Sequence, residues 1–134
     1  MNHDVIAQNL LVVEEHMRNE AVDPDLVMSL YTDDVVLEVP GRGLHLDTHE
    51  AIRRNYIEMF ASLADVEIIP NDRFATAERV FDDTTVRFRL VGDGMLNAPV
   101  AKGTRVELRL LHVFQMRCGR IAREQVFETW KALD

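Results

Sequence analysis

Between Val106 and Met116 every second residue of the chain is apolar, with a single exception. A period of two over this length predicts a long β-strand that turns one face toward a core and the other toward solvent. The exception is His112, which stands on the apolar line. A polar side chain in that position is either hydrogen-bonded within the core or used by a binding site. This strand therefore constrains both the fold and the search for a site.

Three helices are predicted, all in the first half of the chain. The first covers residues 4–18, and His16 lies off its apolar stripe, so we expect His16 to be exposed. The second runs from Asp23-Pro24 to Tyr31, because an Asp-Pro pair is typical of a helix start. The third begins near residues 47–50, where Asp and Glu three apart form a variant of the capping box. Helices therefore precede the long strands.

Strand patterns occur at residues 35–39, at 66–90 and again from 105 to 130. Asp82-Asp83 is the predicted turn of a hairpin within the second region. Helices followed by strands that hairpins connect favour an α+β fold with an antiparallel sheet. A length of 134 residues is typical of one domain, which we expect to span residues 1–134.

Charge and cysteine content exclude several classes of protein. Fifteen Lys and Arg against 23 Asp and Glu give a net charge of −8, which disfavours nucleic acid and anionic membranes as partners. The lone Cys118 has no partner in the chain for a disulfide or a multi-cysteine zinc site. The first residues show no basic leader, and no apolar run approaches the ~18 residues of a membrane span. We expect a cytoplasmic protein.

No motif indicates a metal or a cofactor. His49-Glu50 begins like a metalloprotease motif, but the second histidine of that motif would fall on Arg53. Gly41-Arg42-Gly43 lacks the third glycine of a dinucleotide fingerprint and leads into a loop. We therefore expect neither a metal nor a cofactor.

The turn after the long strand decides which residue faces His112. A two-residue turn at 118–119 places Gln125 opposite it, whereas a three-residue turn at 117–119 places Glu124 opposite it. Three-residue hairpins commonly end with a glycine in the left-handed region, and Gly119 stands at that place. This favours the pairing of His112 with Glu124.

In the favoured pairing three ionisable groups share one face: His112, Glu124 and, about 13 Å further along the strand, Glu128. A carboxylate beside a histidine in an apolar cleft raises the pKa of the imidazole and orients it, which suits general acid/base chemistry. We predict these three residues as catalytic. The alternative is a core histidine bonded to Glu124, with no substrate within reach.

Several segments resemble one known superfamily. They are LYTDDVVLEVP at residues 30–40, THEAI at 48–52, GRI at 119–121 and EQVFE at 124–128. Together they are similar to the nuclear transport factor 2-like superfamily, and within it to the SnoaL-like polyketide cyclases. The resemblance covers nearly the whole chain. It implies a cone-shaped, strongly curved antiparallel sheet packed against three helices, with an internal pocket and dimers formed through the outer face of the sheet.

The resemblance also implies site residues. Relatives of the cyclase and isomerase type carry a polar residue at the position of His112 and an acidic one near the end of the last strand, which is Glu128 here. The residues expected to line the pocket are Glu15, Leu37, Val39, Tyr56, Phe88, Leu108, Leu110 and Val126.

Two branches of the superfamily are disfavoured. The catalytic Asp of the ketosteroid isomerases corresponds to Val39, and the carbonyl-polarising Tyr of their first helix corresponds to Glu15. The Arg and Asp that limonene epoxide hydrolases use correspond to Leu110 and His112. Neither mechanism matches these residues.

We expect a cofactor-independent acid/base enzyme that acts on a small hydrophobic molecule, of the cyclase, isomerase or dehydratase type. The alternative is a noncatalytic ligand-binding or dimerisation module of the same fold. Leu111 and Val113 are apolar on the otherwise charged face of their strand, which suggests a homodimer.

Overall fold

The computed structural model describes residues 2–133, and within them it contains three α-helices and a six-stranded sheet. The helices are α1 (Asn2–Asn19), α2 (Pro24–Ser29) and α3 (His49–Ala61). The strands are β1 (Tyr31–Val39), β2 (Leu44–Leu46), β3 (Leu63–Ala75), β4 (Arg79–Leu90), β5 (Arg105–Arg117) and β6 (Arg120–Ala132), and a short 3₁₀ turn, η1 (Pro40–Arg42), joins β1 to β2.

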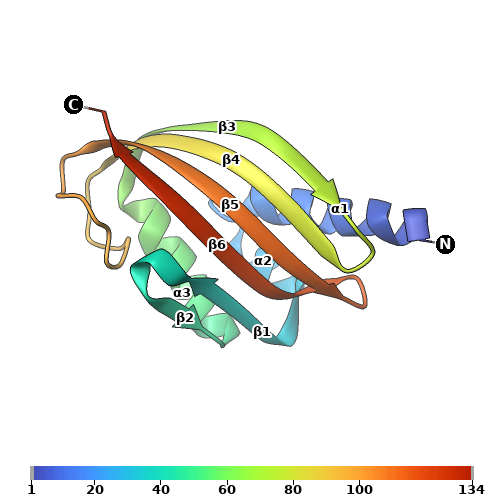
Figure 1. Cartoon of the computed structure of the whole chain (residues 1–134). Coiled ribbons are helices and arrows are strands. Elements are labelled where there is room, and N and C mark those ends of the chain that lie inside the picture. The colour runs from blue at the N-terminus through green and yellow to red at the C-terminus, as the bar shows by residue number, and fades with distance from the viewer. Residues whose placement is uncertain (1, 134) are drawn as a thin grey trace.

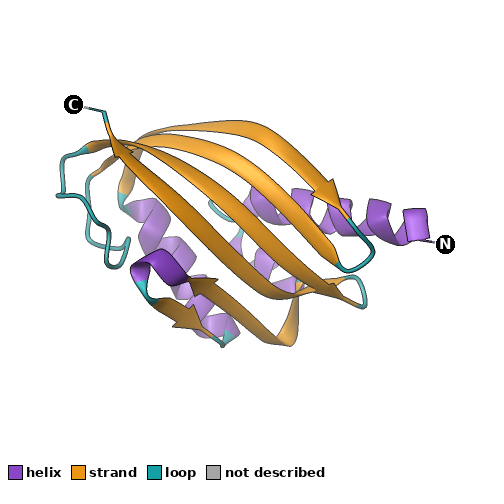
Figure 2. Cartoon of the chain, viewed as in Figure 1, coloured by secondary structure: helices purple, strands orange, loops and turns teal. Residues whose placement is uncertain are grey.

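The curved sheet has the strand order β2-β1-β6-β5-β4-β3, and the three helices lie together on one of its faces (Figure 1, Figure 2). This confirms the predicted α+β class. Neighbouring strands are antiparallel, as expected, except for β1 and β6, which run parallel. The sheet is therefore mixed, because the chain passes through β2, α3 and three long strands before β6 returns beside β1.

The predicted turn at Asp82-Asp83 is wrong. Both residues lie inside β4, where Asp82 pairs with Arg73 and His112 on the two neighbouring strands. The turn lies instead at residues 76–78, where the Thr76 hydroxyl accepts hydrogen bonds from the backbone N–H groups of Glu78 and Arg79. Adjacent aspartates are typical of turns, but here arginines from other strands compensate their charges.

The β5–β6 hairpin differs from both predicted registers. Its turn has two residues, Cys118 and Gly119, both with positive φ (52° and 77°), as a type I′ turn requires. One extra residue, Ala122, then interrupts the pairing, because Met116 pairs with Ile121 while the preceding Gln115 pairs with Arg123. As a result His112 faces neither Gln125 nor Glu124 but Val126.

The bulge determines which side chains of β6 face the helices. Side chains alternate along a strand, so a two-residue turn alone would direct Glu124 and Glu128 away from the helices. The extra residue at Ala122 shifts the alternation by one position. Glu124 and Glu128 therefore face the same side as His112, although the register that predicted this was wrong.

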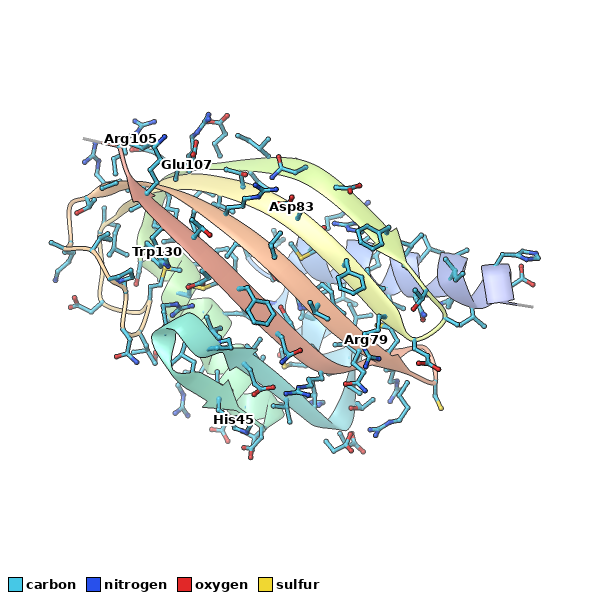
Figure 3. All side chains as sticks on the ribbon, in the orientation of Figure 1. His45, Arg79, Asp83, Arg105, Glu107 and Trp130 are labelled. Carbon is cyan, nitrogen blue, oxygen red and sulfur yellow. The ribbon has the colours of Figure 1, made fainter. Side chains whose placement is uncertain are left out.

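The core lies between the helices and this inner face of the sheet. It includes Val13 of α1, Val27 of α2, Ile52 of α3 and Phe114 of β5, all fully buried. The outer face carries charged side chains such as those of Asp83 and Glu107, which point away from the helices (Figure 3). Leu111 is partly exposed on this face, and the predicted homodimer stays a prediction. None of the described helices is long and apolar enough to cross a membrane.

The loop between β4 and β5 packs closely against the end of α3. The backbone N–H of Gly94 donates to Ser62 Oγ at 2.7 Å, and a Cβ at this position would overlap the carbonyl oxygen of Glu58. We expect Gly94→Ala to lower the free energy of unfolding by about 1–3 kcal/mol, because backbone atoms of α3 must move to make room. Urea denaturation measures this loss. Gly41→Ala is the control, since a Cβ there meets nothing within 4 Å, and equal losses in both variants would contradict the proposed contact.

Candidate active site

A cavity of about 520 Å³ lies between the helices and the inner face of the sheet. Its volume is in the range of small-molecule sites, and most of its wall is apolar. Seven of the eight residues expected to line the pocket do line this cavity: Leu37, Val39, Tyr56, Phe88, Leu108, Leu110 and Val126. The three residues predicted as catalytic, His112, Glu124 and Glu128, line it as well.

The expected place of Glu15 is wrong. Its side chain is 45% exposed and contacts Arg18 at 3.6 Å, outside the cavity. The face of α1 that packs on the core carries Asn9, Val13 and His16, and each step along a helix turns the side chain by about 100°. Glu15 therefore points away from the core because its neighbour His16 points into it.

The predicted exposure of His16 is also wrong, since its side chain is fully buried. Its Nε2 lies 2.8 Å from the Tyr31 hydroxyl, 3.2 Å from the Tyr56 hydroxyl and 3.2 Å from Glu124 Oε1. Tyr31 and Tyr56 donate to the same Oε1 at 2.8 and 3.0 Å. Each hydroxyl gives its one proton to Glu124, so Nε2 serves as the donor to Tyr31. These four residues form the Glu124 cluster.

Within the Glu124 cluster the carboxylate of Glu124 is ionised and His16 opposes its charge. Burial acts to raise the pKa of Glu124, but the positive charges of His16 and His112 and the bond from Tyr31 outweigh it and hold the pKa at about 2. Burial acts to lower the pKa of His16, yet Glu124 and nearby carboxylates raise it above its ordinary value. Burial and the charge of Glu124 raise the pKa of both tyrosines, which therefore stay protonated.

His112 has a different carboxylate partner from the predicted one. Its Nδ1 lies 3.3 Å from Oδ2 of Asp82, the residue directly opposite on β4, which is an ion-pair contact without hydrogen-bond geometry. Asp82 also accepts from Thr84 and Arg73, both at 2.8 Å, and the imidazole stacks on Phe114. The predicted His112–Glu124 contact fails because the bulge moves Glu124 opposite Phe114.

The surroundings of the Asp82–His112 pair favour the charged form of both groups. Burial acts to raise the pKa of Asp82, but His112, Thr84 and Arg73 lower it to about 2. Burial acts to lower the pKa of His112, whereas Asp82, Glu124 and Glu20 raise it, with a net rise above the ordinary value. The imidazolium form is therefore present at neutral pH.

Glu128 lies in a buried ion pair that the sequence did not reveal. Arg42 of η1 donates from Nε and Nη2 to its two oxygens at 2.9 and 3.2 Å, and Trp130 Nε1 donates at 3.1 Å. The Arg42 and Glu128 side chains are 4% and 3% exposed. The Leu96 carbonyl accepts from Arg42 Nη1, which connects the pair to the β4–β5 loop. Arg42 was considered only as part of a failed glycine motif.

His112, Glu124 and Glu128 lie near one another on two neighbouring strands of the sheet. Val126 lies directly opposite His112, so Glu124 and Glu128 are the diagonal neighbours of His112. Such diagonal neighbours are about 7–8 Å apart, measured between backbone positions. With Asp82 beside His112, the wall of the apolar cavity carries one imidazolium, the carboxylates of Asp82, Glu124 and Glu128, and the Tyr56 hydroxyl, a set suited to proton transfer. In the described part of the chain, no group of three or more His, Cys, Asp or Glu side chains could hold a metal ion.

The Glu124 cluster predicts a specific pH dependence of stability. A carboxylate whose folded-state pKa is about 2 instead of 4.5 contributes stability above pH 4.5, and this contribution is lost as the pH falls toward 2. Glu124→Gln should lower the free energy of unfolding by about 3 kcal/mol at pH 7, because it leaves His16 buried without its counter-charge.

Urea denaturation at several pH values between 7 and 2 tests this expectation. The difference between wild type and Glu124→Gln should shrink as the pH falls below 4.5. The exposed Glu50→Gln is the control and should stay close to wild type throughout. A difference that is the same at every pH would contradict the assigned charge of Glu124.

The chain was compared with known proteins. The SnoaL-like domain family matches residues 13–124, whereas a search of curated proteins finds no match. Among solved structures, an LEH-like epoxide hydrolase of M. tuberculosis is 18% identical, with a TM-score of 0.70 over 92% of this chain and 84% of that one.

Two further structures are similar over most of their length. A putative polyketide cyclase of Xanthomonas campestris pv. campestris is 20% identical, with a TM-score of 0.68 over 92% of this chain and 91% of that one. The epoxide hydrolase/cyclase-like enzyme SalBIII, described in pyran ring formation in the polyether salinomycin, is 19% identical, with a TM-score of 0.71 over 92% of both chains. At this identity the structures show a shared fold, and the family match shows that this chain belongs to the SnoaL-like domain family.

Proposed function

We propose that the protein is a cofactor-independent acid/base enzyme that acts on a small hydrophobic molecule in the cavity, with chemistry of the cyclase, isomerase or dehydratase type. The observation that carries this proposal is the Asp82–His112 pair on the wall of a largely apolar cavity of about 520 Å³. Burial of an ionisable pair costs desolvation free energy. Such a pair is therefore found where hydrogen bonds compensate this cost or where the pair serves a function. The chain belongs to the SnoaL-like domain family, and the solved structures similar to it include proteins named as cyclases. Both findings support the proposal at the level of the family.

His112 acts as the proton donor in this proposal. Its Nδ1 faces Asp82, which leaves Nε2 as the ring nitrogen that can meet a ligand. The imidazolium donates the Nε2 proton to an oxygen of the bound molecule and becomes a neutral imidazole, which takes a proton back before the next turnover. Asp82 orients the ring and stabilises its charge, the part that the sequence assigned to Glu124.

The two glutamates take supporting roles. Glu124 keeps a fixed negative charge that favours the protonated form of His112. Glu128 and Arg42 together form a polar end of the cavity that suits an oxygen of the substrate. An acid/base role for Glu128 stays a prediction, since both of its oxygens already accept hydrogen bonds from Arg42.

The second candidate is a noncatalytic binding module. It is favoured by the same saturation of hydrogen bonds, because Glu124 and Glu128 have partners within the protein and need none from a ligand. The two candidates differ in what the loss of His112 does to turnover and to binding.

Replacement of His112 separates them. We expect the wild type to convert at least one member of a panel of small apolar ketones, epoxides and β-hydroxy ketones, followed by mass spectrometry. His112→Ala should lower kcat at least about a hundredfold with little change in KM, because the proton donor is lost while the apolar walls remain. Glu128→Gln in the same assay tests the predicted acid/base role of that residue.

His45→Ala is the matched control, since the exposed side chain of His45 lies on the edge strand β2, outside the cavity lining (Figure 3). Its turnover should equal that of the wild type. The contrary result is that panel members bind without turnover and with the same affinity to wild type and His112→Ala. This result would overturn the proposed enzymatic function and favour the noncatalytic binding module.

A further inference from the structure

Glu20 lines the same cavity and has no role in the chemistry described so far. It is the first residue after α1, and its backbone N–H still bonds to the His16 carbonyl in the last helical turn. Its side chain is 16% exposed, whereas that of Glu124 is 2% exposed. Glu20 is thus a carboxyl group at the cavity wall that a ligand can reach.

His16 connects Glu20 to the Glu124 cluster. Its Nδ1 is buried, has no hydrogen-bond partner among the described residues and lies 3.5 Å from Glu20 Oε2. Its Nε2 already serves Tyr31 and Glu124. The second ring nitrogen is therefore free to interact with Glu20, which is the carboxylate within ion-pair distance of it.

Glu20 differs from the other deep carboxylates in its charge balance. Asp82 has His112 and Arg73 as cations, and Glu128 has Arg42. Among the described residues, the cation within ion-pair distance of Glu20 is His16, and Glu20 shares it with Glu124, which lies closer to it. A carboxylate that shares one cation with a second carboxylate takes up a proton more readily than a carboxylate that has a cation of its own.

The charged groups around Glu20 place its titration near neutral pH. Burial raises its pKa, His16 of α1 and His112 of β5 lower it, and Glu124 of β6 and Asp82 of β4 raise it, with a net pKa of about 7. A general base that is poised near the working pH is the most effective. Glu20 and His112 line the same cavity.

We propose that Glu20 is a second catalytic residue of the cavity, which takes a proton from the bound molecule while His112 gives one, with His16 as its positioning residue. This inference rests on the proposed function. It narrows the substrate to a hydrophobic molecule with an acidic C–H or O–H group and, within reach of His112, an oxygen that accepts a proton.

The protons balance in this step. The Glu20 carboxylate removes a proton from the C–H or O–H bond and becomes a carboxylic acid. The electron pair of that bond moves through the substrate toward the oxygen, which receives the proton of the His112 imidazolium. Water then takes the proton from Glu20 and returns one to His112, so both groups regain their starting states.

The pH profile of turnover tests the role of Glu20. The base works when ionised, so kcat/KM should rise with pH through about 7, and it should fall above the raised pKa of His112 as the acid is lost. Glu20→Gln should lower kcat about a hundredfold and remove the rising limb. Glu78→Gln, a loss of an exposed carboxylate in the β3–β4 turn, should leave rate and profile unchanged.

His16→Gln tests the positioning role separately. Loss of the imidazolium removes the charge that lowers the pKa of Glu20, so the rising limb should move to higher pH. A purely structural role of His16 would lower the amount of folded protein without moving that limb.

A titration that needs no substrate completes the experiment. Carboxyl ¹³C chemical shifts of glutamate-labelled protein, assigned to Glu20 by comparison with Glu20→Gln, should show a midpoint between pH 6 and 8. A midpoint below pH 5 would overturn this inference. Full activity of Glu20→Gln beside an inactive His112→Ala would also overturn it and leave the proposed function standing, whereas full activity of both variants would overturn the proposed function itself.

Discussion

The carboxylate of Glu124 is the constraint around which this fold is arranged. A charge that is 1% exposed must be compensated within the protein. His16, Tyr31 and Tyr56 do so, and each comes from a different element, so one oxygen atom of β6 connects α1, β1 and α3. Hydrogen bonds are directional, whereas apolar attraction is not, so three groups that converge on one oxygen fix the helices relative to the sheet.

The charge of Glu124 also influences the protonation of other groups in the cavity. Glu124 and Asp82 both favour the protonated imidazole of His112, and Glu124 also competes with Glu20 for His16. The polar wall is therefore one coupled set of groups, in which the proton on one depends on the charges of the others. Apolar residues of the same sheet face, such as Leu108 and Phe88, line the cavity next to these groups, and an apolar surrounding strengthens electrostatic interactions.

Much of this architecture was predictable, because it rests on periodicity. The alternation from Val106 to Met116 correctly indicated β5 and the inward position of His112. The register was not predictable, because Ala122 has no property that marks a bulge and its effect depends on pairing between whole strands. Asp82 was misread as a turn residue because the arginines and the histidine that stabilise it lie on other strands. The burial of His16 was not predictable, because the buried face of a helix is recognised by its apolar residues. A polar imidazole on that face does not contribute to the pattern.

The bulge at Ala122 has a consequence for how this chain can change length. An insertion in the loop between β4 and β5 lengthens a connection and leaves the strand faces as they are. Between Gly119 and Arg123, the gain or loss of one residue exchanges the two faces of β6, so that Arg123, Gln125 and Phe127 would enter the cavity in place of Glu124, Val126 and Glu128. In this chain the hairpin length thus selects one of two alternative sets of side chains for the interior, and point substitutions act only within the selected set.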